Sequence, residues 1–288
     1  MKTLVLGSGG QLGLSLAETA PSTVGFVGAG ISPLDITERA ELLNVCRELR
    51  PAVIINAAAY TAVDKAESDI EAATAVNVDG AANAAAAALE IGARLIHIST
   101  DYVFDGKASR PYPVGAETNP INVYGRTKRA GELAVLEAMP GRAVVVRTAW
   151  LYSRNGANFV KTMLRLMAER DSLSVVADQR GTPTWADSLA SAIWAFVAAP
   201  KLAGIFHWTD GGDCTWHDFA VAIQAEALSL GLLQREIPIL AVTTDKYPTA
   251  APRPGYTVMD CSGTWAVLDR RPNPWRENLR RMLEGMVS

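Results

Sequence analysis

Residues 2–13 read KTLVLGSGGQLG, and this stretch decides the fold. The apolar residues 2–6 predict a strand, and the residues from 12 to 19 predict a helix directly after the glycines. Gly7, Gly10 and Gly13 stand at a GxxGxxG spacing between them. Glycines at such a turn let backbone amides approach a pyrophosphate, which the positive end of the helix also favours. No GK[ST] sequence closes the motif, so it is not a P-loop. It predicts a dinucleotide-binding turn, although glycines alone also fit a plain turn.

The rest of the first half alternates strands with helices. Continuous Val and Ile runs predict strands that are covered on both faces, and strand–helix alternation predicts a parallel, doubly wound sheet. We therefore predict an α/β protein, in which residues 1–148 form a Rossmann-type NAD(P)-binding domain. The predicted strands are 23–27, 52–56, 94–99 and 143–147, and the predicted helices are 38–50, 69–91 and 127–138.

The second half has a different texture. Tryptophan, proline and glycine become frequent in loops such as DQRGTPTW (178–185) and HWTDGGDCTW (207–216), which favours a pocket-forming role. We expect a smaller C-terminal α/β substrate domain over 149–288. Residues 185–206 resemble one more helix–strand unit of the sheet, so the two domains are expected to interleave. Helices are predicted at 160–169, 185–198, 216–230 and 275–286.

Composition narrows the class of protein. Among 288 residues, 49% are hydrophobic, 20% are charged and the net charge is −3, which argues against a disordered chain and against a nucleic-acid surface. No apolar run approaches the roughly 20 residues of a membrane span, and the first residues lack a signal-peptide pattern. Cys46, Cys214 and Cys261 lie far apart and are interpreted as reduced thiols. We expect a cytoplasmic protein without membrane or nucleic-acid partners.

Three residues predict proton-coupled hydride transfer. Thr100 follows the strand RLIHIS (94–99), and Tyr124 and Lys128 lie four apart on one face of a predicted helix. A free tyrosine has a pKa of about 10, and we expect Lys128, together with an oxidised nicotinamide, to lower it by stabilising the phenolate. A hydroxyl at a strand end, such as that of Thr100, can orient a substrate carbonyl. A YxxxK pair alone is weak evidence, but its order after the glycine loop and the strand-end threonine favours a reductase.

Other candidates for chemistry are weaker. His97 is interpreted as a packed strand residue, and His207 and His217 have no metal-ligand spacing. Asp64 and Glu67 are interpreted as the solvated start of a helix. No GxSxG elbow indicates a serine hydrolase, and no metal site is predicted.

The cofactor preference depends on the end of the second strand. An acidic residue there would bind the ribose 2′-hydroxyl of NAD, and an arginine would favour NADP. Residues 28–30 read GAG, and the first arginine beyond them is Arg39. We expect NADPH as the cofactor, with NADH also accepted.

These motifs resemble the extended short-chain dehydrogenases/reductases, and within them the dTDP-4-dehydrorhamnose reductases. The resemblance covers nearly the whole chain. STDYVFDG together with NVYGRTKRAGE is rather specific for that group, whereas the glycine loop indicates only a Rossmann fold. The similar segments are GSGGQLG (7–13), LDIT (34–37), INAAAYTAVDKAE (55–67), STDYVFDG (99–106), NVYGRTKRAGE (122–132), VRTAWLY (146–152), NFVKTML (158–164), DQRGTPT (178–184) and PTAAPRP (248–254).

The resemblance implies NAD(P)H-dependent reduction of the 4-keto group of dTDP-4-dehydro-L-rhamnose, the last step of dTDP-L-rhamnose synthesis. Tyr124 would donate the proton, Lys128 would contact the ribose and support Tyr124, and Thr100 would bind the carbonyl. The cofactor would also contact Gly7, Gly10, Gln11, Leu12, Gly13, Asp35, Ile36, Ala59, Tyr60 and Thr61. The substrate would also contact Asp101, Trp150, Asn158, Lys161 and Arg253.

One departure from the family concerns assembly. Some relatives bind magnesium between subunits through acidic residues, one of them in the first helix, where this chain has Ser15. A magnesium-bridged dimer is therefore doubtful, and we expect a monomer or a weak homodimer.

Two rival functions stay open. One is another nucleotide-sugar enzyme of this fold, an epimerase or dehydratase, although dehydratases usually carry a second acid where Tyr102 stands. The other is a non-catalytic, NADP-binding regulatory subunit of methionine adenosyltransferase. The complete set of Thr100, Tyr124 and Lys128 favours catalysis.

Overall fold

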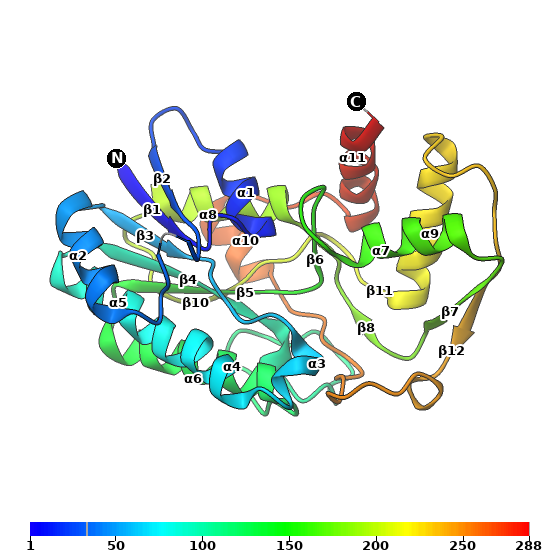
Figure 1. Ribbon diagram of the computed structural model, residues 1–288, viewed down its shortest axis with the longest axis horizontal. Coiled ribbons are helices and arrows are strands. Elements are labelled where there is room, and N and C mark those ends of the chain that lie inside the picture. The colour runs from blue at the N-terminus through cyan, green and yellow to red at the C-terminus, as the bar shows by residue number, and fades with distance from the viewer. Residues whose placement is uncertain (33, 288) are drawn as a thin grey trace.

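The centre of the protein is a six-stranded parallel sheet (Figure 1). The computed structural model describes residues 1–32 and 34–287. The strands lie in the order β10-β5-β4-β3-β1-β2, and every neighbouring pair is parallel. The predicted α/β class and doubly wound parallel sheet are confirmed. The strands are β1 (Lys2–Leu6), β2 (Gly25–Ala29), β3 (Val53–Asn56), β4 (Arg94–Thr100), β5 (Ala143–Thr148) and β10 (Gly204–His207).

Helices cover both faces of this sheet because each strand is apolar on both sides. Leu4 and Leu6 belong to one buried cluster, whereas Val5 between them belongs to the other. The first cluster packs beneath α2 (Arg39–Leu49), α5 (Gly80–Glu90) and α6 (Val123–Ala138). The second lies against α1 (Gln11–Glu18) and α8 (Ala186–Ala198), with α10 (Ser262–Leu268) beside it. The chain therefore returns from its second half to complete this sheet with α8 and β10.

The predicted helix at 69–91 is interrupted. It consists of α4 (Ile70–Thr74), a π-helical turn over Ala75–Asp79 and α5, and a short helix α3 (Val63–Ala66) precedes it. The buried Asn77 lies in the π turn, where its side chain bonds both backbone groups of Tyr60 and the hydroxyl of Thr127. The π turn therefore fixes the segment around Tyr60 against α6, a role that is common for π turns near functional sites.

A smaller lobe stands beside the sheet (Figure 1). Its core lies between α7 (Phe159–Glu169), α9 (Trp216–Ser229) and α11 (Trp275–Val287), with the parallel pair β7 (Leu173–Val176) and β12 (Ile239–Val242) along one side. The strand β12 and the helix α10 were not predicted, because their sequences are too short to show a period. Two further short pairs follow: β6 (Leu151–Tyr152) is parallel to β9 (Thr184–Trp185), and β8 (Arg180–Gly181) is antiparallel to β11 (Cys214–Thr215).

Strand order locates the crevice that a ligand can use. From β1 the chain goes to β2 on one side, and β3 then lies on the other side of β1. Helices diverge at such a switch point and leave a crevice at the carboxyl ends of the strands.

Within residues 1–32 and 34–287, no helix is long and apolar enough to cross a membrane.

Candidate active site

A cavity of about 920 Å³ occupies this crevice and extends toward the small lobe. Most residues that the sequence singled out line it, but Gly13, Lys161 and Arg253 do not. The predicted residues in its wall are Gly7, Gly10, Gln11, Leu12, Asp35, Ile36, Ala59, Tyr60, Thr61, Thr100, Asp101, Tyr124, Lys128, Trp150 and Asn158. Gly30, from the corner that the sequence linked to cofactor preference, also lines the cavity. The wall further contains residues that sequence reasoning did not name as site residues: Gly9, Ile31, Leu34, Ala57, Ala58, Val76, Ile98, Ser99, Thr148, Ala149, Leu151, Gly156 and Ala157.

The three loop glycines have different tasks. Gly7 has φ +76°, and a Cβ there would lie 2.6 Å from the Ala58 nitrogen. A Cβ on Gly13 would lie 2.4 Å from the Gly7 carbonyl oxygen. These two glycines therefore shape the turn itself. A Cβ on Gly10 would come no closer than 3.4 Å to its neighbours, so this position is not crowded by the protein.

The amino end of α1 opens into the cavity. Gly10 is its N-cap residue, and no side chain in the described part of the chain caps the helix. By contrast, Asn122 caps α6 and Asn158 caps α7 through their side-chain oxygens. Free first-turn amides at a glycine turn, with Gln11 and Leu12 in the cavity wall, fit the pyrophosphate of a dinucleotide.

The end of β2 carries small and apolar groups. Gly30, Ile31, Leu34 and Ile36 line the cavity there together with Asp35. The Asp35 carboxylate accepts hydrogen bonds from the amide and the hydroxyl of Thr37, both at 2.9 Å. The acid therefore belongs to a local turn that follows β2 and does not stand at the strand end itself.

The candidate catalytic groups come from two elements. Thr100 ends β4, whereas Tyr124 and Lys128 lie in the first two turns of α6. The helix begins at Val123, four residues before the predicted start, because the Asn122 side chain accepts the Gly125 amide at 2.8 Å. The Thr100 hydroxyl lies beside the Tyr124 phenol and is one of the groups that affect its pKa. Three residues that are separated in the sequence are thus brought together in one site.

Gly125 explains how closely α6 approaches. A Cβ at this position would lie 2.2 Å from the Tyr102 carbonyl oxygen, so only glycine fits between the helix and the segment after β4. Tyr102 also packs edge-on against the Tyr124 ring, with the centroids 5.7 Å apart. These contacts fix the phenol beside the end of β4.

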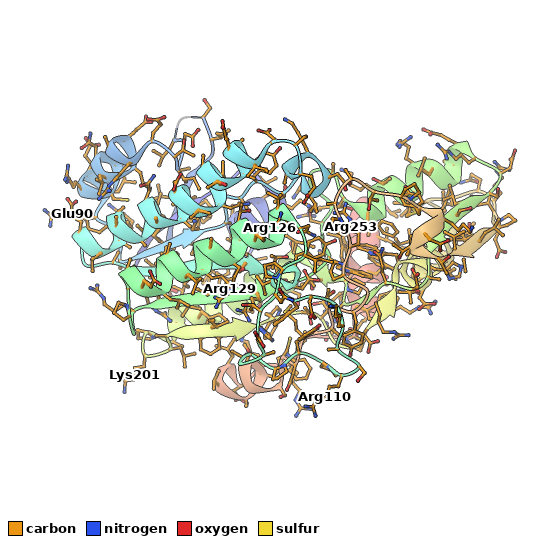
Figure 2. The ribbon with its side chains drawn as sticks, turned by 90° about the horizontal axis from the view of Figure 1, so that it is seen from below. Glu90, Arg110, Arg126, Arg129, Lys201 and Arg253 are labelled. Atoms are coloured by element: carbon orange, nitrogen blue, oxygen red, sulfur yellow. The ribbon has the colours of Figure 1, made fainter. Side chains whose placement is uncertain are left out.

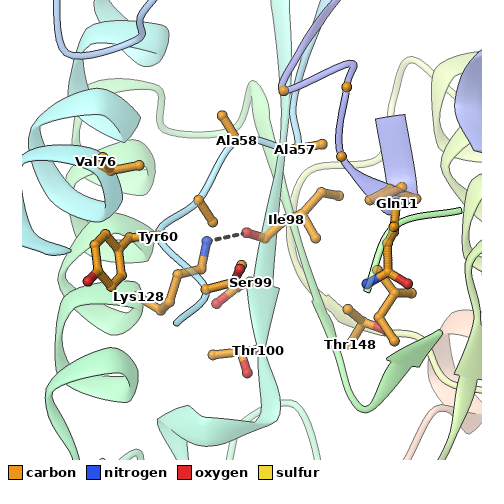
Figure 3. Close-up of a pocket in the computed structure, with 18 of the residues that line it drawn as sticks. Gln11, Ala57, Ala58, Tyr60, Val76, Ile98, Ser99, Thr100, Lys128 and Thr148 are labelled. Atoms are coloured by element: carbon orange, nitrogen blue, oxygen red, sulfur yellow. Dashed lines mark hydrogen bonds between the residues drawn. The ribbon is translucent and has the colours of Figure 1, made fainter. Parts of the chain in front are cut away.

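Burial, not Lys128, dominates the electrostatics of the phenol. Burial raises the pKa of Tyr124 to about 12, although Thr100 acts in the opposite direction. The expectation that Lys128 and an oxidised nicotinamide together lower this pKa concerns the protein with bound cofactor and stays a prediction. The Lys128 ammonium donates to the Ile98 carbonyl at 2.6 Å (Figure 3). Burial lowers the pKa of Lys128 to about 8, against the opposing charge of Glu132. At neutral pH the phenol holds its proton.

Asp101 extends the polar row of Tyr124 and Thr100. It is 2% exposed and accepts the Thr100 hydroxyl at 3.0 Å. Its Oδ2 atom has no hydrogen-bond partner in the described part of the chain. Burial raises the pKa of Asp101 to about 6. The row ends in Asp101, which also lines the cavity.

Trp150 forms an aromatic wall of the cavity. Its backbone has φ +44°, and its ring stacks on Trp216 with centroids 3.5 Å apart and an interplanar angle of 8°. A Cβ at Gly181 would lie 2.6 Å from the Trp150 ring, so glycine is required on that side. This fixed ring faces the part of the cavity nearest the small lobe.

Gln11 joins the glycine loop to the small lobe. Its side-chain oxygen accepts the Asn158 amide at 3.0 Å and the Ser153 hydroxyl at 3.2 Å. In Figure 3, Gln11 and Thr148 lie on one side of β4, and Lys128 and Tyr60 lie on the other. The cavity therefore spans the carboxyl end of the sheet.

Lys161 and Arg253 are placed outside the cavity wall. The Lys161 ammonium donates to the Arg154 carbonyl at 3.3 Å. Arg253 lies where the sheet meets the small lobe (Figure 2), and its guanidinium pairs with Asp64 at 2.7 Å. One nitrogen of this guanidinium, Nη1, is buried without a partner in the described chain.

Asp64 is exposed in the first turn of α3, as the sequence suggested, and Glu67 directly follows this helix, but both acids also bind partners. Asp64 accepts the Ala251 amide at 3.0 Å in addition to its ion pair with Arg253. Glu67 accepts the Val123 amide at 2.7 Å, at the first residue of α6. Both partners are distant in sequence, so no local pattern announces them. The two acids hold the 251–253 loop and α6 beside the cavity.

The histidines take structural positions. His97 is 1% exposed, with its Nδ1 atom 3.2 Å from the Asn56 amide nitrogen, and burial lowers its pKa well below the usual value. His207 lies beside Arg147, and burial lowers its pKa to about 4. Residues 1–32 and 34–287 contain no group of three His, Cys, Asp or Glu side chains able to hold a metal ion.

Comparison with known proteins identifies the relatives of this chain. A family model described as the RmlD substrate binding domain matches residues 1–288. A dTDP-4-dehydrorhamnose reductase of Salmonella typhimurium is 39% identical, over 100% of this chain and 99% of the relative. A dTDP-4-keto-6-deoxy-D-glucose reductase of Streptomyces niveus is 42% identical, over 89% and 87% respectively. The crystal structure of dTDP-4-dehydrorhamnose reductase from Bacillus anthracis in complex with NADP is similar, with a TM-score of 0.92 and 37% identity over 98% of each chain.

Proposed function

This chain belongs to the family of dTDP-4-dehydrorhamnose reductases, and we propose that it reduces the 4-keto group of dTDP-4-dehydro-L-rhamnose to dTDP-L-rhamnose with NADPH. It is an NAD(P)H-dependent oxidoreductase of dTDP-rhamnose synthesis. One observation carries the assignment: a single cavity contains both the uncapped end of α1 and the row Tyr124–Thr100–Asp101. Such a cavity can hold a dinucleotide and a carbonyl group together.

The dinucleotide fits the residues of this cavity. The open first turn of α1 and Gly10 would hold the pyrophosphate, and Asp35 and Ile36 would lie beside the adenosine. Ala59, Tyr60 and Thr61 would hold the nicotinamide half together with Lys128. When bound, the reduced nicotinamide supplies a hydride to the keto carbon. Because no acid or arginine ends β2, we infer that both NADPH and NADH are accepted.

The chain itself supplies the proton. Tyr124 holds its proton at neutral pH and donates it to the C4 oxygen of the sugar as negative charge develops there. The Thr100 hydroxyl, which donates to Asp101 in the structure, would turn to donate to the same oxygen and thereby orient the carbonyl. Lys128 keeps a positive charge close to this centre, because the Ile98 carbonyl holds its ammonium at the cavity wall. The three groups thus act on one oxygen atom.

We assign the remaining cavity wall to the nucleotide sugar. Asp101 and Trp150 offer a carboxylate and a flat ring to the sugar, and Asn158 is available from the small lobe. Lys161 and Arg253 would reach the diphosphate after moving toward it, and Arg253 would exchange or share its partner Asp64.

The protein is proposed to act as a monomer or a weak homodimer. Its three free, buried thiols favour a reducing compartment such as the cytoplasm.

The configuration of the sugar must also be tested, because the Streptomyces niveus relative is named for a D-glucose-derived substrate. The test follows NADPH oxidation with dTDP-4-dehydro-L-rhamnose, with dTDP-4-keto-6-deoxy-D-glucose and with UDP- and GDP-linked 4-keto sugars. We expect the highest kcat/KM for dTDP-4-dehydro-L-rhamnose. A preference for the D-configured sugar would replace this substrate, and absence of turnover with every sugar would favour a binding protein.

A further inference from the structure

A buried carboxylate lies directly behind the candidate catalytic groups. Glu132 on α6 is 0% exposed and uses both of its oxygens. Its Oε1 atom accepts the Ser99 hydroxyl at 2.6 Å and the Arg147 Nε at 2.8 Å. Its Oε2 atom accepts Arg147 Nη2 at 2.8 Å and Arg129 Nη1 at 3.0 Å. One side chain therefore joins α6 to the ends of β4 and β5.

Arg147, the main partner of Glu132, is as deeply buried and is held on its other sides as well. It is 1% exposed, and its Nη1 atom lies 3.4 Å from His207 Nε2 on β10. The Phe104 ring lies 5.2 Å from the guanidinium carbon. Burial lowers the pKa of His207 to about 4, so this ring is neutral and can accept from Arg147 while its Nδ1 atom faces the Asp260 carbonyl. The cluster thus connects three neighbouring strands with one helix.

The cluster has a fixed position relative to the cavity. Ser99 is the strand partner of Arg147, and Thr100, the next residue, is the partner of Thr148. Both threonines and Ser99 line the cavity, so the ion pair lies directly next to the cavity floor. On α6, Glu132 follows Lys128 by four residues and Tyr124 by eight, which places all three on one face of the helix.

We propose that Glu132 is a positioning residue: its bonds to Ser99 and Arg147 set the place of Lys128 and Tyr124 on α6 relative to Thr100 on β4. This rests on the proposed reductase function. A surface helix pair is worth little, but a desolvated carboxylate with four donors holds two elements in one geometry. A reaction that needs a phenol, an ammonium and a strand-end hydroxyl around one oxygen depends on such a geometry.

Glu132 also acts on Lys128 through its charge. Burial disfavours the ammonium of Lys128, and Glu132 opposes this effect. Burial acts to raise the pKa of Glu132 itself, but Arg147, Ser99 and Arg129 outweigh it, so the net direction is down and the carboxylate stays ionised. Removal of this charge leaves Lys128 near the uncompensated Arg147. The ammonium should then lose its proton at a lower pH.

The experiment measures NADPH affinity and turnover in Glu132→Gln and Glu132→Asp between pH 7 and 9.5. Other groups around Lys128 do not titrate in this range, because His97 on β4 and Asp101 lose their protons below it and Tyr124 loses its proton above it. On the other side of Glu132 lie the guanidinium groups of Arg147 and Arg129. We expect Glu132→Gln to lower kcat by about 10–100-fold. The alkaline loss of NADPH affinity should move down by about one pH unit.

Glu132→Asp separates position from charge. It keeps the carboxylate but shortens the side chain, so we expect a lower kcat with the wild-type pH dependence of NADPH affinity. The matched control is Val135→Ala, which removes buried apolar contacts from the same helix and leaves the carboxylate in place. It should lower the melting temperature while retaining kcat and the pH profile.

Several outcomes would overturn the proposal. A folded Glu132→Gln variant with the wild-type kcat and the wild-type pH profile would contradict it. A loss of kcat in Val135→Ala as large as that in Glu132→Gln would also contradict it. If Glu132→Gln does not fold, the Ser99→Ala variant tests the proposal instead, because it retains the ion pair between Glu132 and Arg147. It should lower kcat several-fold at unchanged NADPH affinity, and a wild-type kcat would contradict the proposed role. NADPH binding is measured without sugar, so a wrong substrate assignment would appear separately, as an inactive wild type.

Discussion

At the scale of single residues, the phenol of Tyr124 shows how surroundings set chemistry. Its ring is buried beside Tyr102, and its hydroxyl lies beside Thr100. Burial raises its pKa to about 12, which suits a group that must arrive at the reaction with its proton. Lys128, held by the Ile98 carbonyl, adds its charge from the cavity wall.

The first prediction concerns this hydroxyl. Tyr124→Phe removes the proton donor and one hydrogen bond, so kcat should fall by about 10²–10⁴-fold while the fold and the NADPH affinity stay near wild type. Thr100→Val should reduce kcat less, by about 10–300-fold, because it removes one donor to the developing charge. Single-turnover kinetics and NADPH titration measure both quantities. A Tyr124→Phe enzyme with near wild-type kcat would require another proton donor.

At the scale of elements, the glycine loop and the first turn of α1 form a backbone site. Gly7 and Gly13 are required by backbone contacts, whereas a Cβ on Gly10 would come no closer than 3.4 Å to the protein. The same three glycines in one motif therefore serve two different purposes, turn formation and access for a ligand.

Gly10→Ala and Gly13→Ala should separate these purposes. The new methyl group at residue 13 meets the Gly7 carbonyl at 2.4 Å, so unfolding free energy should fall by about 1–3 kcal/mol. At residue 10 the fold tolerates the methyl group, but NADPH affinity should fall by about tenfold, or 1.4 kcal/mol. Denaturant unfolding and NADPH titration distinguish the two. Equal stability of both variants would contradict the assigned roles.

The end of β2 carries a prediction about cofactor choice. The wild type should bind NADH and NADPH within about tenfold of each other, because neither an acid nor an arginine ends the strand. Gly30→Asp adds a carboxylate where a Cβ meets nothing closer than 3.7 Å, so the fold should be retained. The acid should favour NADH by more than tenfold through the ribose hydroxyls. Binding titrations of both cofactors test this, and an unchanged ratio would place the adenosine elsewhere.

Elements and local motifs could be predicted from the sequence because their signals are local. The Val/Ile runs predict β3, β4 and β5, and the spacing of Tyr124 and Lys128 places them on one helix face. The start of α6 was predicted four residues late, since its cap depends on one side chain, that of Asn122. The partners of Asp64 and Glu67 could not be predicted, because they lie 187 and 56 residues away. The ion pair of Arg253 with Asp64 could not be predicted for the same reason, because the two residues are 189 positions apart.

At the scale of the whole molecule, the two lobes are joined by polar contacts around the cavity. Glu18 on α1 pairs with Arg154, and Gln11 accepts Asn158 and Ser153. On the opposite side, Asp64 pairs with Arg253. These contacts are partly exposed, so each contributes little to stability. Together they fix the small lobe over the cavity that both lobes share.

Asp210 gives a prediction about pH and global stability. It follows β10, is 1% exposed, and accepts the Trp185 amide at 3.0 Å at the start of α8. Burial raises its pKa from 3.8 to about 6, so the folded protein binds this proton more tightly than the unfolded chain. Its contribution is present below pH 4 and is lost as pH rises to 6.

Asp210→Asn removes this dependence. The stability of wild type relative to the variant should therefore decline between pH 4 and 7, by at most about 3 kcal/mol. Denaturant unfolding of both proteins at several pH values measures the difference, and other titrating groups cancel because both proteins share them. A difference that grows with pH would show that the folded protein prefers the charged form of Asp210.

The late arrival of α8 has a consequence for the nascent chain. When a ribosome has synthesised residue 148, the strands β1, β3, β4 and β5 are complete. The helix α8, which packs on Val5, Ile55 and Val146, follows only at residues 186–198. One face of the growing sheet therefore has only α1 to cover it during the synthesis of α7 and β7. Exposed apolar surface of this kind promotes aggregation and recruits chaperones. The molecule can complete its first lobe only after part of the second has been translated.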